Sequence, residues 1–133
     1  MIIVRVLVWI ARIAGLGALV LGLSFWIAQV DLISLHMLFG LTLALSILVL
    51  SFVVIFTRGM RLLGAAGIVY TFILPLFGLT QATLLIGNLH WLIQAAHLLV
   101  GLGALALVQA IYTRYQRFKG PARGVMVSEQ AAR

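Results

Sequence analysis

Four long apolar stretches separated by short links constrain this 133-residue chain more than any other feature. A helix needs about 20 apolar residues to cross a bilayer, and runs of this length occupy about residues 6–28, 33–57, 62–86 and 89–113. Hydrophobic residues make up 65% of the chain and charged residues only 8%, which are too few to cover a water-soluble domain. We therefore predict an all-α membrane protein with four transmembrane helices.

The links between the runs differ in charge. Residues 29–31 and 87–88 contain no Lys or Arg, whereas the central link carries Arg58 and Arg61, and the other basic residues lie towards the two ends of the chain. Short links make neighbouring helices antiparallel, which predicts an up-down bundle. Basic segments stay on the cytoplasmic side. We expect a multi-pass protein of the bacterial or archaeal plasma (inner) membrane, with both termini in the cytoplasm, surrounded by membrane lipids and not bound to nucleic acid.

The end of the chain has a different composition from the apolar runs. Residues 120–133 include Pro121, Gly124 and several polar residues, so we expect a transmembrane domain at 1–119 followed by a loosely ordered cytoplasmic tail. The chain has no cysteine, which excludes disulfides, thiolate metal ligands and thiol catalysis.

An internal repeat relates the second and fourth runs. His36 to Leu41 and His97 to Leu102 both read His-x-Leu-x-Gly-Leu, and the first and third runs share a weaker echo, Gly-Leu-Ser at residue 22 and Gly-Leu-Thr at residue 78. The chain therefore reads as two helical hairpins in tandem. Both hairpins begin on the same side, so the axis relating these parallel repeats runs along the membrane normal. This symmetry predicts that His36 and His97 face each other across the bundle.

Two facing histidines inside a membrane indicate haem binding. Ionisable side chains within membrane spans usually point inward and serve a function, and two neutral imidazoles can bind one iron from opposite sides. Gly40 and Gly101 follow one turn after each histidine on the same helix face, where they leave room for a flat porphyrin. We predict one haem b per chain, with His36 and His97 as iron ligands.

A second candidate ligand stands on the fourth run. His90, Gln94, His97 and Gly101 form a single stripe at spacings of four, three and four residues, and we include His90 and Gln94 among the cofactor-binding candidates. The depth of each histidine in the membrane can be counted back from the next arginine on the inner side, Arg58 for His36 and Arg114 for His97 and His90. By this count His36 lies about 7 Å nearer the outer face than His97, and the depth of His90 is closer to that of His36. The repeat favours His97 as the second ligand, and the depth favours His90.

The stretch from Gly78 to Gly87, Gly-Leu-Thr-Gln-Ala-Thr-Leu-Leu-Ile-Gly, together with His-Leu-Leu-Val-Gly-Leu from His97, resembles one four-helix half of the haem A synthase family, and the chain is similar to small bis-His membrane b-type cytochromes. The resemblance covers about the last sixty residues well. It implies haem ligands on the second and fourth helices, at His36 and His97. The family's acidic residue shortly before the helix-two histidine is absent here, and Asp31 lies in the link. A single chain of this kind is expected to bind haem without the family's oxidation chemistry.

These observations leave three functions open. The first is a membrane b-type cytochrome, an electron-transfer protein or subunit that exchanges electrons with quinone. The second is a cofactor-free structural subunit of a larger respiratory or photosynthetic complex, since small Leu-rich bundles often only pack. The third is a haem A synthase-like enzyme that acts as a dimer. We expect other membrane subunits or a second copy of the chain as partners. We expect the chain to act as an electron-transfer protein or subunit rather than as a stand-alone enzyme.

Overall fold

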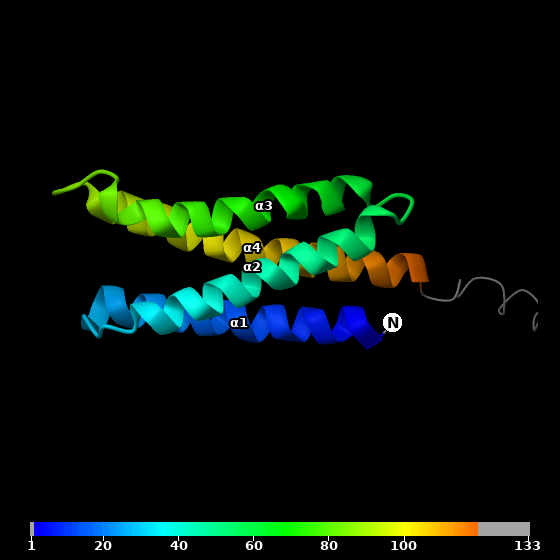
Figure 1. Ribbon diagram of the computed structural model, residues 1–133, viewed down its shortest axis with the longest axis horizontal. Helices are drawn as coiled ribbons and strands as arrows, with labels where there is room; N and C mark the ends of the chain where they lie inside the picture. The colour runs from blue at the N-terminus through cyan, green and yellow to red at the C-terminus, as the bar shows by residue number, and fades with distance from the viewer. Residues whose placement is uncertain (1, 120–133) are drawn as a thin grey trace, which may run out of the picture.

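The computed structural model describes residues 2–119 and shows an all-α four-helix bundle. Within these residues there is no strand. Each of the four helices is long and apolar enough to cross a membrane, as expected for a multi-pass membrane protein. The elements in chain order are α1 (Ile2–Ala28), α2 (Ile33–Ile55), α3 (Arg61–Thr80), a short 3-10 turn η1 (Gln81–Thr83) and α4 (His90–Lys119) (Figure 1). The expected tail at 120–133 lies outside the described residues.

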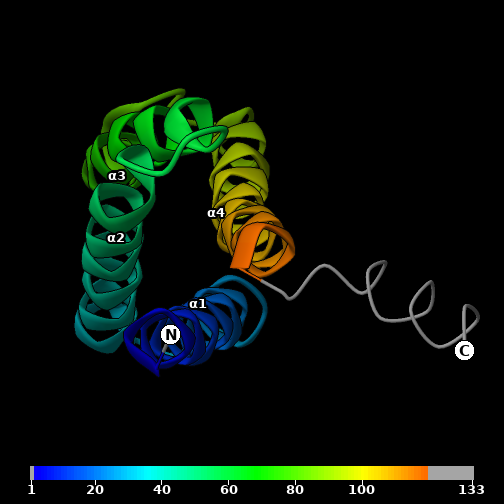
Figure 2. The same cartoon turned by 90° about the vertical axis from the view of Figure 1, so that its right-hand side faces the viewer.

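The helices alternate in direction along the bundle axis and follow one another around it in chain order. Figure 2 shows α1, α2, α3 and α4 arranged as a ring, with the end of α4 returning to α1. Helix α2 packs against both α1 and α3, and it also contacts α4 across the ring. The start of α1, the link between α2 and α3 and the end of α4 lie at one end of the bundle (Figure 1). We call it the basic end, because Arg58, Arg61, Arg114 and Arg117 lie there, and we call the opposite one the far end.

Two helix ends differ by six residues from the sequence-based prediction, and the other boundaries by four or fewer. Helix α3 ends at Thr80 instead of continuing to residue 86, and α4 continues to Lys119 instead of ending near 113. After η1 the chain turns through Leu85 and Gly87, both with positive φ, at 47° and 103°. Hydropathy does not distinguish an apolar link from an apolar helix, so the apolar residues 84–86 were predicted to continue the helix. The extension of α4 is rich in Arg and Gln, which are good helix formers outside the apolar layer as well.

The packed core occupies only the half of the bundle nearer the basic end. We call residues 2–15, 43–71 and 104–119 the basic half, and residues 16–42 and 72–103 the far half. Every buried side chain among the described residues belongs to the basic half, with Ile47, Leu50, Val54, Val108 and Ile111 fully enclosed at its centre. In the far half every residue keeps part of its surface exposed. The same four helices are therefore tightly packed at one end and loosely packed at the other.

Small residues explain the tight packing of the basic half. A Cβ atom added to Gly64 would lie 2.8 Å from the Cα of Ile55, so α3 approaches the backbone of α2 directly there. Gly67, one turn later, faces the hydroxyl of Ser51. In lipid the hydrophobic effect does little to bring helices together, so van der Waals contact of this kind has to stabilise the bundle.

Candidate haem site

The structure brings His36 and His97 together in the far half. His36 is the fourth residue of α2 and His97 the eighth residue of α4, and their ring centroids are 5.8 Å apart with the ring planes tilted by 53°. An imidazole nitrogen binds a first-row transition metal at about 2 Å, which puts the centroids of two rings on opposite sides of one metal about 6 Å apart. The observed separation is close to this value.

His36 is held in place by the backbone of the neighbouring helix. Its Nδ1 lies 2.8 Å from the carbonyl oxygen of Ala18 in α1. A carbonyl oxygen can only accept a hydrogen bond, so we assign the proton to Nδ1, which leaves the lone pair of Nε2 free. Metal-binding histidines commonly donate one ring N–H to a backbone carbonyl in this way, which fixes the ring and makes the other nitrogen a better ligand.

His97 is enclosed differently. Its Nδ1 is buried and has no hydrogen-bond partner among the described residues, and its ring stacks on Phe77 of α3 with centroids 5.8 Å apart and planes only 12° from parallel. The ring of His97 therefore neighbours both Phe77 and His36. Burying a polar nitrogen without a partner is unfavourable, so His97 has an unsatisfied polar atom beside the site.

The two hairpins repeat the same contact between a glycine and a histidine. A Cβ on Gly22 of α1 would lie 3.1 Å from Cε1 of His36, and a Cβ on Gly78 of α3 would lie 3.5 Å from Cε1 of His97. In each hairpin the first helix thus presents a glycine to the histidine of the second helix. The weak sequence echo between residues 22 and 78 reflects this equivalence in space.

Gly40 and Gly101 face open space. A Cβ added to either residue would find no atom within 4 Å, apart from its own helix. Most other helical glycines of the bundle lie against a neighbouring side chain or backbone. Both glycines lie one turn after a histidine of the pair, so space remains beside the pair on both helices. That these two glycines face a flat cofactor stays a prediction.

His90 and Gln94 lie on the same helix as His97 but are not part of the ring pair. His90 is the first residue of α4, and its Nδ1 lies 3.2 Å from the carbonyl oxygen of Leu84 in the link before the helix. Gln94, one turn further along, is half-buried. His90 is about 10 Å from His97 along the helix axis. The depth argument had favoured His90 by counting from Arg58 and Arg114. Arg58 follows the end of α2, whereas α4 continues past Arg114 to Lys119, so the two arginines do not mark the same level of the bundle.

The set of donor atoms indicates what kind of group could bind. No cluster of three or more His, Cys, Asp or Glu side chains occurs within residues 2–119, whereas a metal ion held by protein alone usually takes three or four such ligands. Two imidazoles on opposite sides complete the coordination of an iron whose four in-plane ligands come from a porphyrin. The pair therefore fits haem better than a bare metal ion.

The sequence pattern identified the two histidines but not the groups that contact their rings. Ala18 contributes only a backbone carbonyl, which no side-chain motif can reveal, and Phe77 is one of many aromatic residues in apolar helices. Gly22 and Gly78 were visible as a repeated pair, but their contact with the histidines was not. Comparisons with protein-family models, curated proteins and solved structures gave no significant match.

Proposed function

We propose that the chain is a membrane b-type cytochrome that binds one haem b between His36 and His97 and acts as an electron-transfer protein or subunit. The observation that carries this proposal is the ring pair, with centroids 5.8 Å apart and one ring anchored through Nδ1. Bound haem supplies one-electron oxidation and reduction of its iron. The protein holds the two rings at a fixed separation and surrounds them with apolar helices.

The loose packing of the far half supports this assignment. A porphyrin needs volume next to its ligands, and the pair lies where no residue is fully buried and where Gly40 and Gly101 face open space. The far half contains no Lys or Arg. The carboxylates of the haem would then depend on neutral donors at the far end, for which Asn88, His90, Trp91 and Gln94 are the candidates.

Quinone is the proposed redox partner, because it is dissolved in the bilayer and the pair lies within helices that can span it. Other membrane subunits or a second copy of the chain are further partners. A second copy would supply a second histidine pair, which a haem A synthase-like enzyme needs in order to hold both a cofactor haem and a substrate haem. In the monomer we assign no oxidation chemistry to the site.

We place the basic end in the cytoplasm of a bacterial or archaeal cell, because the arginines of residues 2–119 gather at that end and the single acid within the same residues, Asp31, lies at the other. Since the chain has no native cysteine, one introduced thiol gives an unambiguous signal. Asn88→Cys should react with a membrane-impermeant maleimide in intact spheroplasts, whereas Thr57→Cys should react only after the membrane is opened. The reverse labelling pattern would overturn the orientation.

An absorption spectrum of the purified chain tests the proposed function. Protein expressed with a haem supply should show the bands of a low-spin, six-coordinate haem that sharpen on reduction, and His36→Ala or His97→Ala should abolish this spectrum. His90→Ala is the comparison variant on the same helix. It removes a donor proposed for the haem carboxylates and not an iron ligand, so the haem that binds should keep the low-spin, six-coordinate spectrum even where binding is weaker.

Two results would contradict the haem assignment. An unchanged spectrum in both ligand variants would show that the iron is bound elsewhere. Colourless wild-type protein that co-purifies with a large membrane complex would favour a cofactor-free structural subunit, in which the histidine pair only joins α2 to α4.

A further inference from the structure

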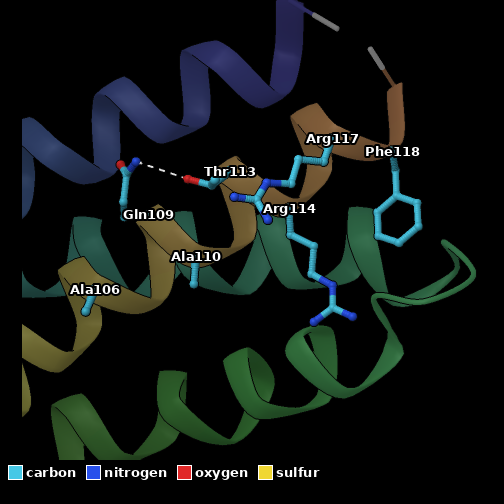
Figure 3. Close-up of a pocket in the computed structure, with 7 residues that line it drawn as sticks. All are labelled: Ala106, Gln109, Ala110, Thr113, Arg114, Arg117 and Phe118. Carbon is cyan, nitrogen blue, oxygen red and sulfur yellow. Dashed lines mark hydrogen bonds between the residues drawn. The ribbon is translucent and has the colours of Figure 1, made fainter. Parts of the chain in front are cut away.

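A groove on α4 at the basic end is unrelated to the histidine pair. It has a volume of about 710 Å³. Ala106 and Ala110 form its floor, Gln109 and Thr113 lie beside them, and Arg114 and Arg117 follow towards the basic end (Figure 3). These residues recur every three or four positions, so they occupy one face of the helix. The groove is open and lies on the surface of the bundle, since all of these side chains are exposed.

The groove changes from apolar to cationic along its length. From Ala106 to Arg117 the helix rises about 16 Å, from a small, apolar surface to two guanidinium groups, with the ring of Phe118 beside them. Figure 3 shows Arg117 bending back towards Thr113, while Arg114 points to the other side of the helix, where α3 lies. A ligand that matches this surface has an apolar chain at one end and an anionic group at the other.

Nothing within residues 2–119 neutralises these two arginines. The only acidic residue in that part of the chain is Asp31, at the far end of the bundle. Arg12, by contrast, has partners inside the bundle: its guanidinium donates to Oε1 of Gln109 at 2.5 Å and lies over the rings of Trp9 and Tyr112. Within residues 2–119, no acidic side chain therefore competes with an anionic ligand for Arg114 and Arg117.

We propose that this groove binds one anionic phospholipid, with an acyl chain along Ala106 and Ala110 and the phosphate at the arginine end of the groove. Arginine pairs with phosphate through two parallel hydrogen bonds, and basic pockets at the membrane surface recognise anionic headgroups. The alanine floor favours a lipid over free phosphate, because a free anion would make no use of it. This site is independent of the proposed haem function.

Native mass spectrometry of the full chain, released from micelles containing equal amounts of phosphatidylglycerol and phosphatidylcholine, tests the proposal. Wild-type protein should retain one phosphatidylglycerol in preference to phosphatidylcholine. The double variant Arg114→Gln/Arg117→Gln should weaken this retention about 20-fold or more, since each arginine near an anionic lipid surface contributes about 1 kcal/mol. Arg58→Gln/Arg61→Gln is the matched control: it removes the same charge at the same end, outside the groove, and should weaken retention far less.

A second variant separates lipid binding from a general effect of charge or folding. Ala110→Leu leaves both arginines in place but fills the floor of the groove, and it should also weaken retention of phosphatidylglycerol. Inorganic phosphate at millimolar concentration should not displace the lipid. Three results would each overturn the proposal: equal retention of the two lipids by the wild type, equal losses in the two double arginine variants, or displacement by free phosphate.

Discussion

The basic half and the far half of this bundle are built from the same four helices, yet only the basic half encloses side chains completely. In the basic half Gly64 and Gly67 bring α3 against the backbone and the small side chains of α2. In the far half Gly40 and Gly101 face open space, and two imidazole rings meet with their centroids 5.8 Å apart. The difference shows that tight packing is confined to one half of the bundle, which is therefore the half that stabilises the fold.

Truncating a core side chain should distinguish the two halves most strongly. Ile47 is fully buried in the basic half, whereas Leu38 of the same helix is 58% exposed in the far half. Ile47→Ala should lower the free energy of unfolding by about 2–3 kcal/mol, because it leaves a cavity. Leu38→Ala should change it by less than about 0.5 kcal/mol. Reversible unfolding in mixed micelles measures both, and equal losses would contradict the division into halves.

Adding a methyl group to a glycine should have opposite consequences in the two halves. Gly64→Ala should destabilise the protein by about 1–2 kcal/mol, because the new Cβ would collide with the backbone of α2. Gly101→Ala should keep the stability of the haem-free protein or raise it by up to about 1 kcal/mol, since alanine favours the helix.

Haem titration completes this glycine comparison. Gly101→Ala should bind haem more weakly than Gly64→Ala does, because only Gly101 lies beside the histidine pair. Unfolding in micelles and the Soret band report the two quantities separately. A haem affinity that falls only in Gly64→Ala would show that the open space in the far half is not where haem binds.

The smallest expected effect concerns the boundary between the halves. The hydroxyl of Tyr70 in α3 donates to the carbonyl oxygen of Val100 in α4 at 2.8 Å, one turn before the basic half of α4 begins. Tyr70→Phe should cost about 0.6 kcal/mol, the average for interhelical hydrogen bonds in membranes. Tyr112→Phe is the control, because Tyr112 donates no hydrogen bond to another described residue, and it should change stability less. Unfolding midpoints measured side by side test this difference.

Much of the fold was predictable because a bilayer imposes a minimum length on apolar helices. The four runs predicted the number, order and direction of the helices, and the His-x-Leu-x-Gly-Leu repeat selected the two histidines that meet. The end of α3 was not predictable, because Leu84–Ile86 is as apolar as the helix before it. Hydropathy describes transfer into lipid and not the backbone conformation.

The division between the halves and the supports of the ring pair were also hidden from the sequence. Apolar residues run through both halves, so composition gives no sign that the core ends near Leu43 and Ala104. The carbonyl of Ala18 and the ring of Phe77 reach the histidines only because each helix has a particular rotation about its axis. That rotation follows from three-dimensional packing, which periodicity alone does not determine.

The long link before α4 has a consequence for how the two hairpins can be altered. Gly78 and His97 are five residues further apart in sequence than Gly22 and His36, yet each glycine touches its histidine in the same manner. The extra residues are absorbed by η1 and the irregular stretch that follows, outside the regular helices. The number of residues in 84–88 can therefore vary without changing the helices themselves. Shortening or lengthening this stretch would shift α4 along its axis relative to the other helices and change the distance between the rings of His36 and His97.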